Sequence, residues 1–168
     1  VEAAHASGVH VALDNTYAAG VMFDAFAHGV DISMQALTKY VGGHSDLLLG
    51  SVSTRDAAGV EKLGPIYQQL GLAVSPDDCS LALRGLQTLA LRLDMLEKNA
   101  LTIAHWLAEQ PLVDRVLHPA MASCPGHDLW VRDFSGSTSV FSFVFDNHID
   151  AKQVINFINN LQIFRIGM

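Results

Sequence analysis

Lys39 is the residue whose surroundings are best suited to chemistry. It lies in the segment Ala-Leu-Thr-Lys-Tyr-Val, after a largely apolar run, and the next carboxylate along the chain is Asp46. Burial disfavours the charged form of an amine, and a neutral amine can attack a carbonyl to form a Schiff base. A structural lysine that packs its stem on apolar surface gives the same pattern. The surroundings of Lys39 therefore fit both a catalytic lysine and a structural one.

Asp14 is the second candidate, because it follows the short apolar run 9–13, which predicts a strand. Open α/β sheets bind ligands at the carboxyl ends of their parallel strands. Pyridoxal phosphate needs a lysine to hold its aldehyde and an acid to keep its ring nitrogen protonated. An aspartate about 25 residues before Lys39 meets that need. Taken alone, Asp14 before Asn15 and Thr16 would be interpreted as a turn or cap residue.

The elements that must position these two residues form an α/β pattern in the first half of the chain. Residues 9–13 have the continuous apolar character of a strand buried on both faces of a parallel sheet. A short helix-like turn then breaks at Gly29, and strands are predicted near 30–34 and within 47–55. Such alternation of helices and strands favours an α/β sheet.

Residues 75–110 predict one long helix that allows for a kink. Ser75 is suited to cap it, with Pro76 at the first helical position. Apolar residues recur at steps of three and four along it, namely Leu86, Leu89, Leu93, Leu96, Ala100, Ile103 and Leu107. The opposite face is expected to be solvated or locally paired, and carries Arg92, Glu97, Lys98 and Glu109.

The back part of the chain is interpreted as a small α+β unit. A strand is predicted after Pro111, followed by an irregular stretch, and then by a strand at 140–145 with its three phenylalanines on one face. A helix capped by Asp150 is expected next, with four residues facing inward, namely Val154, Ile155, Ile158 and Leu161. The run 161–168 looks like a further strand.

Composition sets the general class of the protein. Half of the 168 residues are apolar, and 17 acidic residues stand against 10 basic ones, which argues against nucleic-acid and anionic-membrane partners. No apolar run reaches the roughly 20 residues that span a bilayer, so a cytoplasmic protein is expected. Cys79 and Cys124 form no Cys-x-x-Cys pair, and His44 with Asp46 matches no zinc signature, so no metal is predicted.

Four segments carry a resemblance to a known family: LDNTYAAG, TKYVGGHSDLLLG, RGLQTLALR and RDFSGSTSVFSF. They closely resemble the pyridoxal-phosphate enzymes of cysteine and methionine metabolism, the family of cystathionine lyases and cystathionine γ-synthase. The resemblance runs from about Val9 to the chain end. It implies that Lys39 bonds the cofactor aldehyde, that Asp14 pairs with the ring nitrogen and that Thr38 donates to the phosphate. Members often have a serine where this chain has Ala36.

The resemblance also implies a fold and a domain division. The fold expected is that of the aspartate-aminotransferase class, known as fold type I of the pyridoxal-phosphate enzymes. Residues 1–95 would form the later part of the large α/β cofactor domain, and residues 96–168 the linking helix and the start of a small α+β domain. The chain lacks an initial methionine and is expected to be a fragment with little or no activity alone.

Two segments, DNTYAAG and PGHDLWVRDFSGSTSVFSF, look more like the β-lyases of this family than like its γ-enzymes. The implied reaction is β-elimination of cystathionine, an amino-acid thioether, to homocysteine, pyruvate and ammonia, within a homotetramer built of dimers. A γ-synthase, γ-lyase or methionine γ-lyase is the alternative, and a non-catalytic remnant of the fold is the second. Arg84, Arg92 and Arg132 are not assigned to the substrate carboxylate, because the family's arginine for it would lie beyond the chain end.

Overall fold

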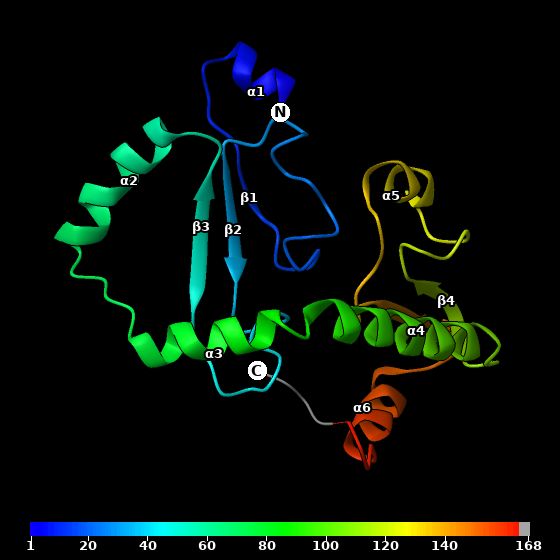
Figure 1. Ribbon diagram of the computed structural model, residues 1–168. Coiled ribbons are helices and arrows are strands. Elements are labelled where there is room, and N and C mark those ends of the chain that lie inside the picture. Colours follow the sequence, from blue (N-terminus) through cyan, green and yellow to red (C-terminus); the bar gives the residue numbers. More distant parts are fainter. Residues whose placement is uncertain (165–168) are drawn as a thin grey trace.

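The computed structural model describes residues 1–164 and arranges them around two small sheets (Figure 1). Its elements are, in order, α1 (Glu2–Ala6), β1 (Ala12–Asp14), β2 (Ile32–Ala36), β3 (Gly50–Thr54), α2 (Ala57–Gln69), α3 (Pro76–Leu86), α4 (Leu89–Ala108), β4 (Val113–Leu117), α5 (His127–Asp133), β5 (Ser142–Phe145) and α6 (Ala151–Asn159). Within residues 1–164, no helix combines the length and the apolar character that a bilayer crossing needs. The part of the predicted strand 161–168 beyond residue 164 lies outside the described residues, and residues 161–164 form no strand.

The first sheet has the order β1-β2-β3 and contains the end of the strand predicted before Asp14. β1 runs parallel to β2, with Asp14 opposite Met34, whereas β3 runs antiparallel to β2. The expectation of strands buried on both faces of a parallel sheet is therefore wrong, since two residues of β1 are exposed and the sheet is mixed. Helices normally cover both faces of a parallel sheet, but α2 swings outward from the end of β3 (Figure 1).

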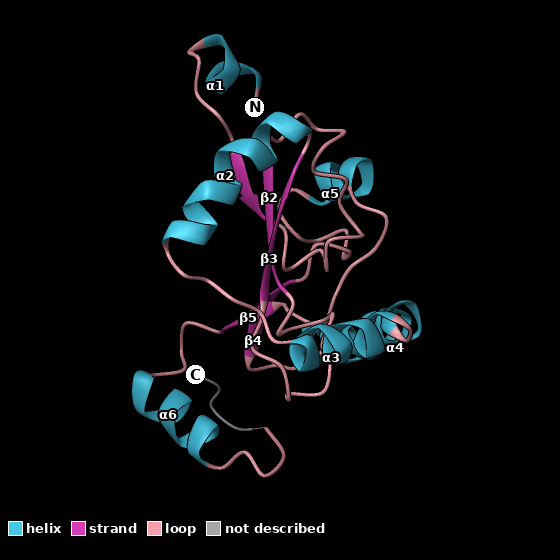
Figure 2. Cartoon of the chain, turned by 60° about the vertical axis from the view of Figure 1, so that its left-hand side comes forward, coloured by secondary structure: helices cyan, strands magenta, loops and turns pink. Residues whose placement is uncertain are grey.

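The predicted long helix is divided into α3 and α4 at Gln87 and Thr88. Its start is as predicted, because the Ser75 hydroxyl accepts from the N–H of Asp78 at 3.0 Å. At the break, the N–H of Thr88 donates to the Gly85 carbonyl at 3.2 Å, a bond to the third residue before it as in a tight turn. Figure 1 shows α3 passing below the end of the sheet at which β2 finishes, and α4 continuing from there toward β4. Figure 2 shows the same elements from another side, with helices in cyan and strands in magenta.

Two hydrophobic cores lie within residues 1–164. The first packs segments that follow β1 and β2 against α3 and α4, and its buried members are Ala19, Val41, Leu47, Ala82, Leu89 and Leu93. The second lies between α4 and the small sheet and contains Ala104, Val116 and Met121. The predicted apolar stripe is thus correct for its central members, but Leu86 and Ile103 are 49% and 41% exposed. α4 therefore contributes to both cores.

The small sheet pairs β4 with β5 in antiparallel order, and α6 packs against it through aromatic contacts. Phe143 and Phe145 both contact Phe157, with ring centroids 6.5 and 5.4 Å from it. Asp150 caps α6 as predicted, since its carboxylate accepts from the N–H of Gln153 at 2.8 Å.

The predicted inward face of α6 is wrong for Ile155 and Ile158, which are 56% and 37% exposed. Phe157 takes the contacts with the sheet instead, because its ring is large enough to reach two phenylalanines of β5. The structure also contains two helices that the sequence analysis missed, α2 and α5. A start signal for α2 was present in Asp56, whose carboxylate accepts from the N–H of Gly59 at 3.0 Å.

Candidate functional site

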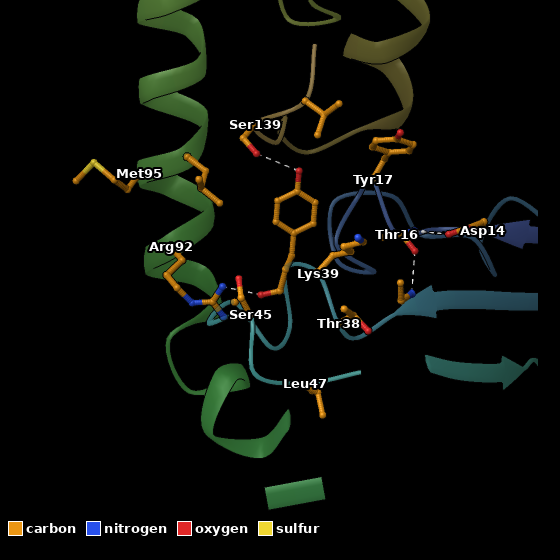
Figure 3. Close-up of a pocket in the computed structure, with 15 residues that line it drawn as sticks. Asp14, Thr16, Tyr17, Thr38, Lys39, Ser45, Leu47, Arg92, Met95 and Ser139 are labelled. Carbon is orange, nitrogen blue, oxygen red and sulfur yellow. Dashed lines mark hydrogen bonds between the residues drawn. The ribbon is translucent and has the colours of Figure 1, made fainter. Parts of the chain in front are cut away.

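A cavity of about 1010 Å³ lies where the strand ends, the turn after β2 and α4 meet. Asp14 comes from the end of β1, and Thr38 and Lys39 come from the turn that follows β2. Arg92 of α4 and Ser139 of the loop before β5 complete the far side (Figure 3). The three residues singled out in the sequence for cofactor chemistry therefore share one cavity.

Asp14 is exposed and is held by Thr16. The N–H of Thr16 donates to Asp14 Oδ1 at 2.9 Å. Hydrogen bonds from the Thr16 side chain, and then from its backbone, lower the pKa of Asp14 below its ordinary value. The carboxylate is therefore anionic at neutral pH, as an acid that pairs with a protonated ring nitrogen must be. The same bond also makes the turn that the alternative interpretation of Asp14 expects.

Thr16 ties the ends of β1 and β2 together. Its hydroxyl accepts from the N–H of Ala36 at 2.8 Å, so the loop after Asp14 is fixed against the residues just before Thr38 and Lys39. In the sequence, Thr16 is recognisable only as a threonine two residues after a strand-end aspartate. That pattern predicts the contact with Asp14 but not the hydrogen bond with Ala36 on β2.

Lys39 lies in a turn whose backbone is held by hydrogen bonds. Its N–H donates to Ala36 O at 3.1 Å, and its carbonyl accepts from the N–H of Gly43 at 2.9 Å. In the view of Figure 3 its side chain extends toward the side of the cavity that carries Thr16. Lys39 is exposed, so residues 1–164 do not form the desolvated pocket expected around it. Its neighbours in sequence are apolar, but those side chains pack into the core under the turn instead of over the amine.

Thr38 lies on the cavity with its hydroxyl already bonded to Leu49. The hydroxyl donates to Leu49 O at 3.2 Å and accepts from Leu49 N–H at 3.0 Å. A hydroxyl has a single hydrogen to donate. A phosphate bound by Thr38 would therefore have to take that hydrogen from Leu49 O, while the bond from Leu49 N–H can persist.

Two members of the predicted solvated face of α4 have distant partners, so that prediction is wrong for them. Arg92 donates to backbone carbonyls after Lys39, and Glu97 Oε1 accepts from Ser137 N and Oγ at 2.7 and 2.8 Å. Helical periodicity places a side chain on a face but carries no information about segments that return to that face later in the chain. Lys98 is locally paired as expected, with Asp94 at 2.8 Å.

The remaining charged candidates have partners other than the groups of the cavity. Arg84 hydrogen-bonds Asp46 and lowers the pKa of that carboxyl. Arg132 Nε donates to Asp133 Oδ1 at 2.7 Å. His44 Nδ1 lies 2.8 Å from the Gly42 carbonyl. These contacts explain the residues as parts of turns and ion pairs outside the chemistry of Lys39.

Comparison with known proteins places the chain in a family. The family model described as Cys/Met metabolism PLP-dependent enzyme, where PLP is pyridoxal phosphate, matches residues 1–168. The chain belongs to this family. Its cofactor is accordingly pyridoxal 5'-phosphate, and the sequence expectation of that cofactor is confirmed.

Curated relatives and a solved structure agree with the family. Cystathionine beta-lyases from Haemophilus influenzae and Escherichia coli are each 41% identical to it over 94% of this chain, and the chain covers 39% and 40% of their lengths. Cystathionine gamma synthase from Xanthomonas oryzae, solved in complex with cystathionine, superposes with a TM-score of 0.92 at 34% identity, over 100% of this chain and 43% of that one. The expected fold type I architecture is therefore confirmed.

The residues present fit the cofactor in number and kind. One cavity presents a primary amine, an anionic carboxylate and a hydroxyl, which are the groups that an aldehyde, a protonated ring nitrogen and a phosphate require. Its volume is at the upper end of the range usual for small-molecule sites. The chain spans between about two fifths and one half of the length of the curated relatives that it matches.

Proposed function

We propose that the chain carries the lysine-bearing part of a pyridoxal-phosphate carbon–sulfur lyase. Its reaction is β-elimination of cystathionine, in which cystathionine and water give homocysteine, pyruvate and ammonia. The observation that carries the proposal is the convergence of Lys39, Asp14 and Thr38 on one cavity. Asp14 lies about 25 residues before Lys39, so the fold must bring the two together. The core beneath the cavity contains neither the Lys39 amine nor the Asp14 carboxylate, so packing does not explain their presence.

Each of the three side chains has a distinct task. The Lys39 amine bonds the cofactor aldehyde and, once the substrate amine has replaced it, accepts the proton from the substrate α-carbon. The Asp14 carboxylate keeps a proton on the ring nitrogen, and Thr38 donates its hydroxyl hydrogen to the phosphate. Pyridoxal phosphate, when bound, supplies a protonated ring that withdraws electrons from the substrate α-carbon.

β-Elimination is preferred over γ-chemistry on two grounds. The two segments DNTYAAG and PGHDLWVRDFSGSTSVFSF have the character of β-lyases. The chain is also 41% identical to the two beta-lyases, against 34% for the gamma synthase. A γ-synthase or γ-lyase is the second candidate, because the gamma synthase superposes so closely.

The first test is covalent. The natural polypeptide that contains residues 1–168 is incubated with pyridoxal phosphate, reduced with borohydride, weighed by mass spectrometry and digested. We expect one stable adduct on the peptide containing Lys39, and its loss in Lys39→Ala. The matched control is Lys98→Ala on α4, which should keep the adduct, since Lys98 is paired with Asp94 away from the cavity.

The second test identifies the reaction. Cystathionine is supplied to the same protein and the keto acid released is identified. Pyruvate is the expected product, whereas 2-oxobutyrate would replace the proposal with γ-cleavage. An adduct on Lys39 with neither keto acid would point to a non-catalytic member of the fold.

The assembly and location belong to the same proposal. A lyase of this family is proposed to work in the cytoplasm as a homotetramer, and the polypeptide limited to residues 1–168 is proposed to have little or no turnover. Light scattering on the natural polypeptide tests the assembly. Pyruvate release by residues 1–168 alone would overturn the second statement.

A further inference from the structure

The guanidinium of Arg92 holds the backbone directly after Lys39. Its Nη1 donates to Tyr40 O at 2.6 Å, and its Nη2 donates to Val41 O at 3.2 Å. Both carbonyls belong to the turn that carries the lysine, although Arg92 lies more than fifty residues later, on α4. Figure 3 shows Arg92 on the helix side of the cavity and Lys39 reaching away from it.

The guanidinium is itself fixed from the other side. Its Nη2 donates to Gly85 O at 2.8 Å, and its Nε donates to Thr88 Oγ1 at 3.0 Å. With the two bonds to the turn, four of its five N–H groups have partners. A Cβ on Gly43 would lie 2.3 Å from Nη1, so the turn closes directly onto the guanidinium. Arg92 thus joins the α3–α4 junction to the lysine turn.

Tyr40 is bound at its far end as well. Its hydroxyl lies 3.2 Å from Ser139 Oγ, within hydrogen-bonding distance (Figure 3). The residue after Lys39 is therefore held at its carbonyl by Arg92 and at its side chain by Ser139. These two contacts add to the backbone hydrogen bonds of Lys39 with Ala36 and Gly43 in fixing the position of the Lys39 Cα, whereas the exposed lysine side chain extends from it through rotatable bonds.

We propose that Arg92 is a positioning residue for Lys39, and this inference rests on the function proposed above. By holding the carbonyls of Tyr40 and Val41, it sets the distance from the lysine amine to the aldehyde carbon of the cofactor. A displacement of about 1 Å of a reacting group can slow a reaction roughly 10²-fold. Binding of a substrate carboxylate by Arg92 is disfavoured, because a single N–H remains for it.

The test compares Arg92→Gln and Arg92→Lys in the natural polypeptide, freed of cofactor and then supplied with pyridoxal phosphate. The rate of linkage to Lys39 is followed by the absorbance of the linked cofactor and by the mass of the borohydride-reduced peptide. We expect linkage to be roughly 10²-fold slower in Arg92→Gln. Arg92→Lys should remain slow, because an ammonium keeps the charge but lacks the planar fork that spans two carbonyls. All rates are compared at one temperature, at which far-UV circular dichroism shows that every variant is folded.

The matched control is Lys98→Gln, which removes a cation from the same helix without touching the turn. It should link at the unaltered rate. Linkage at that rate in Arg92→Gln, or full recovery in Arg92→Lys, overturns the inference, since the fork would then have no effect on Lys39. If Arg92→Gln does not fold, Arg92→Lys decides alone.

Failure of the inference is distinguishable from failure of the proposed function. An unaltered protein that forms no adduct on Lys39 contradicts the function itself. An unaltered protein that forms the adduct, with Arg92 variants that form it equally fast, contradicts only the positioning role.

Discussion

At the scale of single residues, the site depends on polar contacts between side chains and backbone. Thr16 holds Asp14 and Ala36, and Arg92 holds the turn that carries Lys39. Contacts of this kind fix where a charge lies and which protonation state it has. Two residue-level consequences follow, one for the carboxylate in the cavity and one for a carboxylate at the opposite end of the sheet.

Replacement of Asp14 by Asn removes the negative charge but keeps an oxygen that can accept the hydrogen bond from Thr16. Asn can still accept from the N–H of Thr16, so the turn should persist, but it cannot keep a proton on the ring nitrogen. Removing one preorganised electrostatic partner costs roughly 10²–10³ in turnover, and we expect a loss of that size in pyruvate release. The control is Asp24→Asn, a turn aspartate outside the cavity that accepts from the N–H of Ala27 at 3.0 Å. Equal turnover in both variants would contradict the role of Asp14.

Asp31 makes the stability of the first sheet depend on pH. Hydrogen bonds from the Val11 N–H, first, and from His5 lower the pKa of Asp31 from 3.8 to about 2. A depressed folded-state pKa means that the stabilisation is complete above about 4 and is lost as the pH falls toward 2. The melting temperature of Asp31→Asn should therefore lie below that of the unaltered protein at pH 6, and the difference should narrow below about pH 4 and nearly vanish near pH 2. A difference that stays constant with pH would contradict this linkage.

At the scale of elements, the close approach of α3 to the lysine turn decides the shape of the site. Gly85 allows it, because a Cβ at that position would lie 1.9 Å from Val41 O and 2.8 Å from Gly42 O. The carbonyl of Gly85 accepts from the N–H of Thr88, just after the end of α3, and from Arg92 Nη2. The break between α3 and α4 is thus part of how the helices contact the turn.

Gly85→Ala should force α3 away from the turn. Overpacking of this kind costs about 1–3 kcal/mol or more in the free energy of unfolding, and the displaced turn should slow linkage of the cofactor to Lys39. The matched control is Gly50→Ala in β3, where the added Cβ would meet only Gln35 O, at an ordinary contact distance of 3.7 Å. That change should leave the free energy of unfolding unaltered or slightly raised, because glycine loses more conformational freedom on folding than alanine does. Denaturant titration of both variants provides the measurement, and similar effects of the two would contradict the steric argument.

At the scale of the whole molecule, α4 and the loop before β5 join the two cores. α4 runs without a break through residues 95 and 96, where the predicted domain boundary lies, and that division stays a prediction. The loop then returns to the first part of the chain. Thr138 Oγ1 donates to Tyr17 O at 2.9 Å, and Ser135 N–H donates to Met22 O at 2.9 Å.

Glu97 of α4 accepts two hydrogen bonds from Ser137 and so connects the helix to the loop before β5. Glu97→Ala leaves the N–H and hydroxyl of buried Ser137 without their partner, which costs about 1–3 kcal/mol. We expect the second core to melt at a lower temperature than the first, so that thermal unfolding followed by calorimetry broadens or splits. Glu109→Ala, an exposed position after the end of α4, is the control and should leave one transition unchanged. A single unshifted transition in Glu97→Ala would show that the loop does not couple the cores.

The sequence by itself determined the family, the cofactor and several local features of the structure. The cap at Ser75, the cap at Asp150 and the strand that ends at Asp14 depend on residues close together in the chain, so local patterns predicted them. Residue types, spacing and the family resemblance were enough to assign Lys39 and Asp14 to the same cofactor site.

Tertiary structure alone decided which side chains share the cavity and what holds them. The bond from Arg92 to Tyr40 O and the bonds from Ser137 to Glu97 link residues tens of positions apart. The antiparallel course of β3 and the exposure of Lys39 likewise depend on which segments cover which. The physical reason is that hydrogen bonding and burial depend on distance in space, whereas periodicity and capping record only neighbours along the chain.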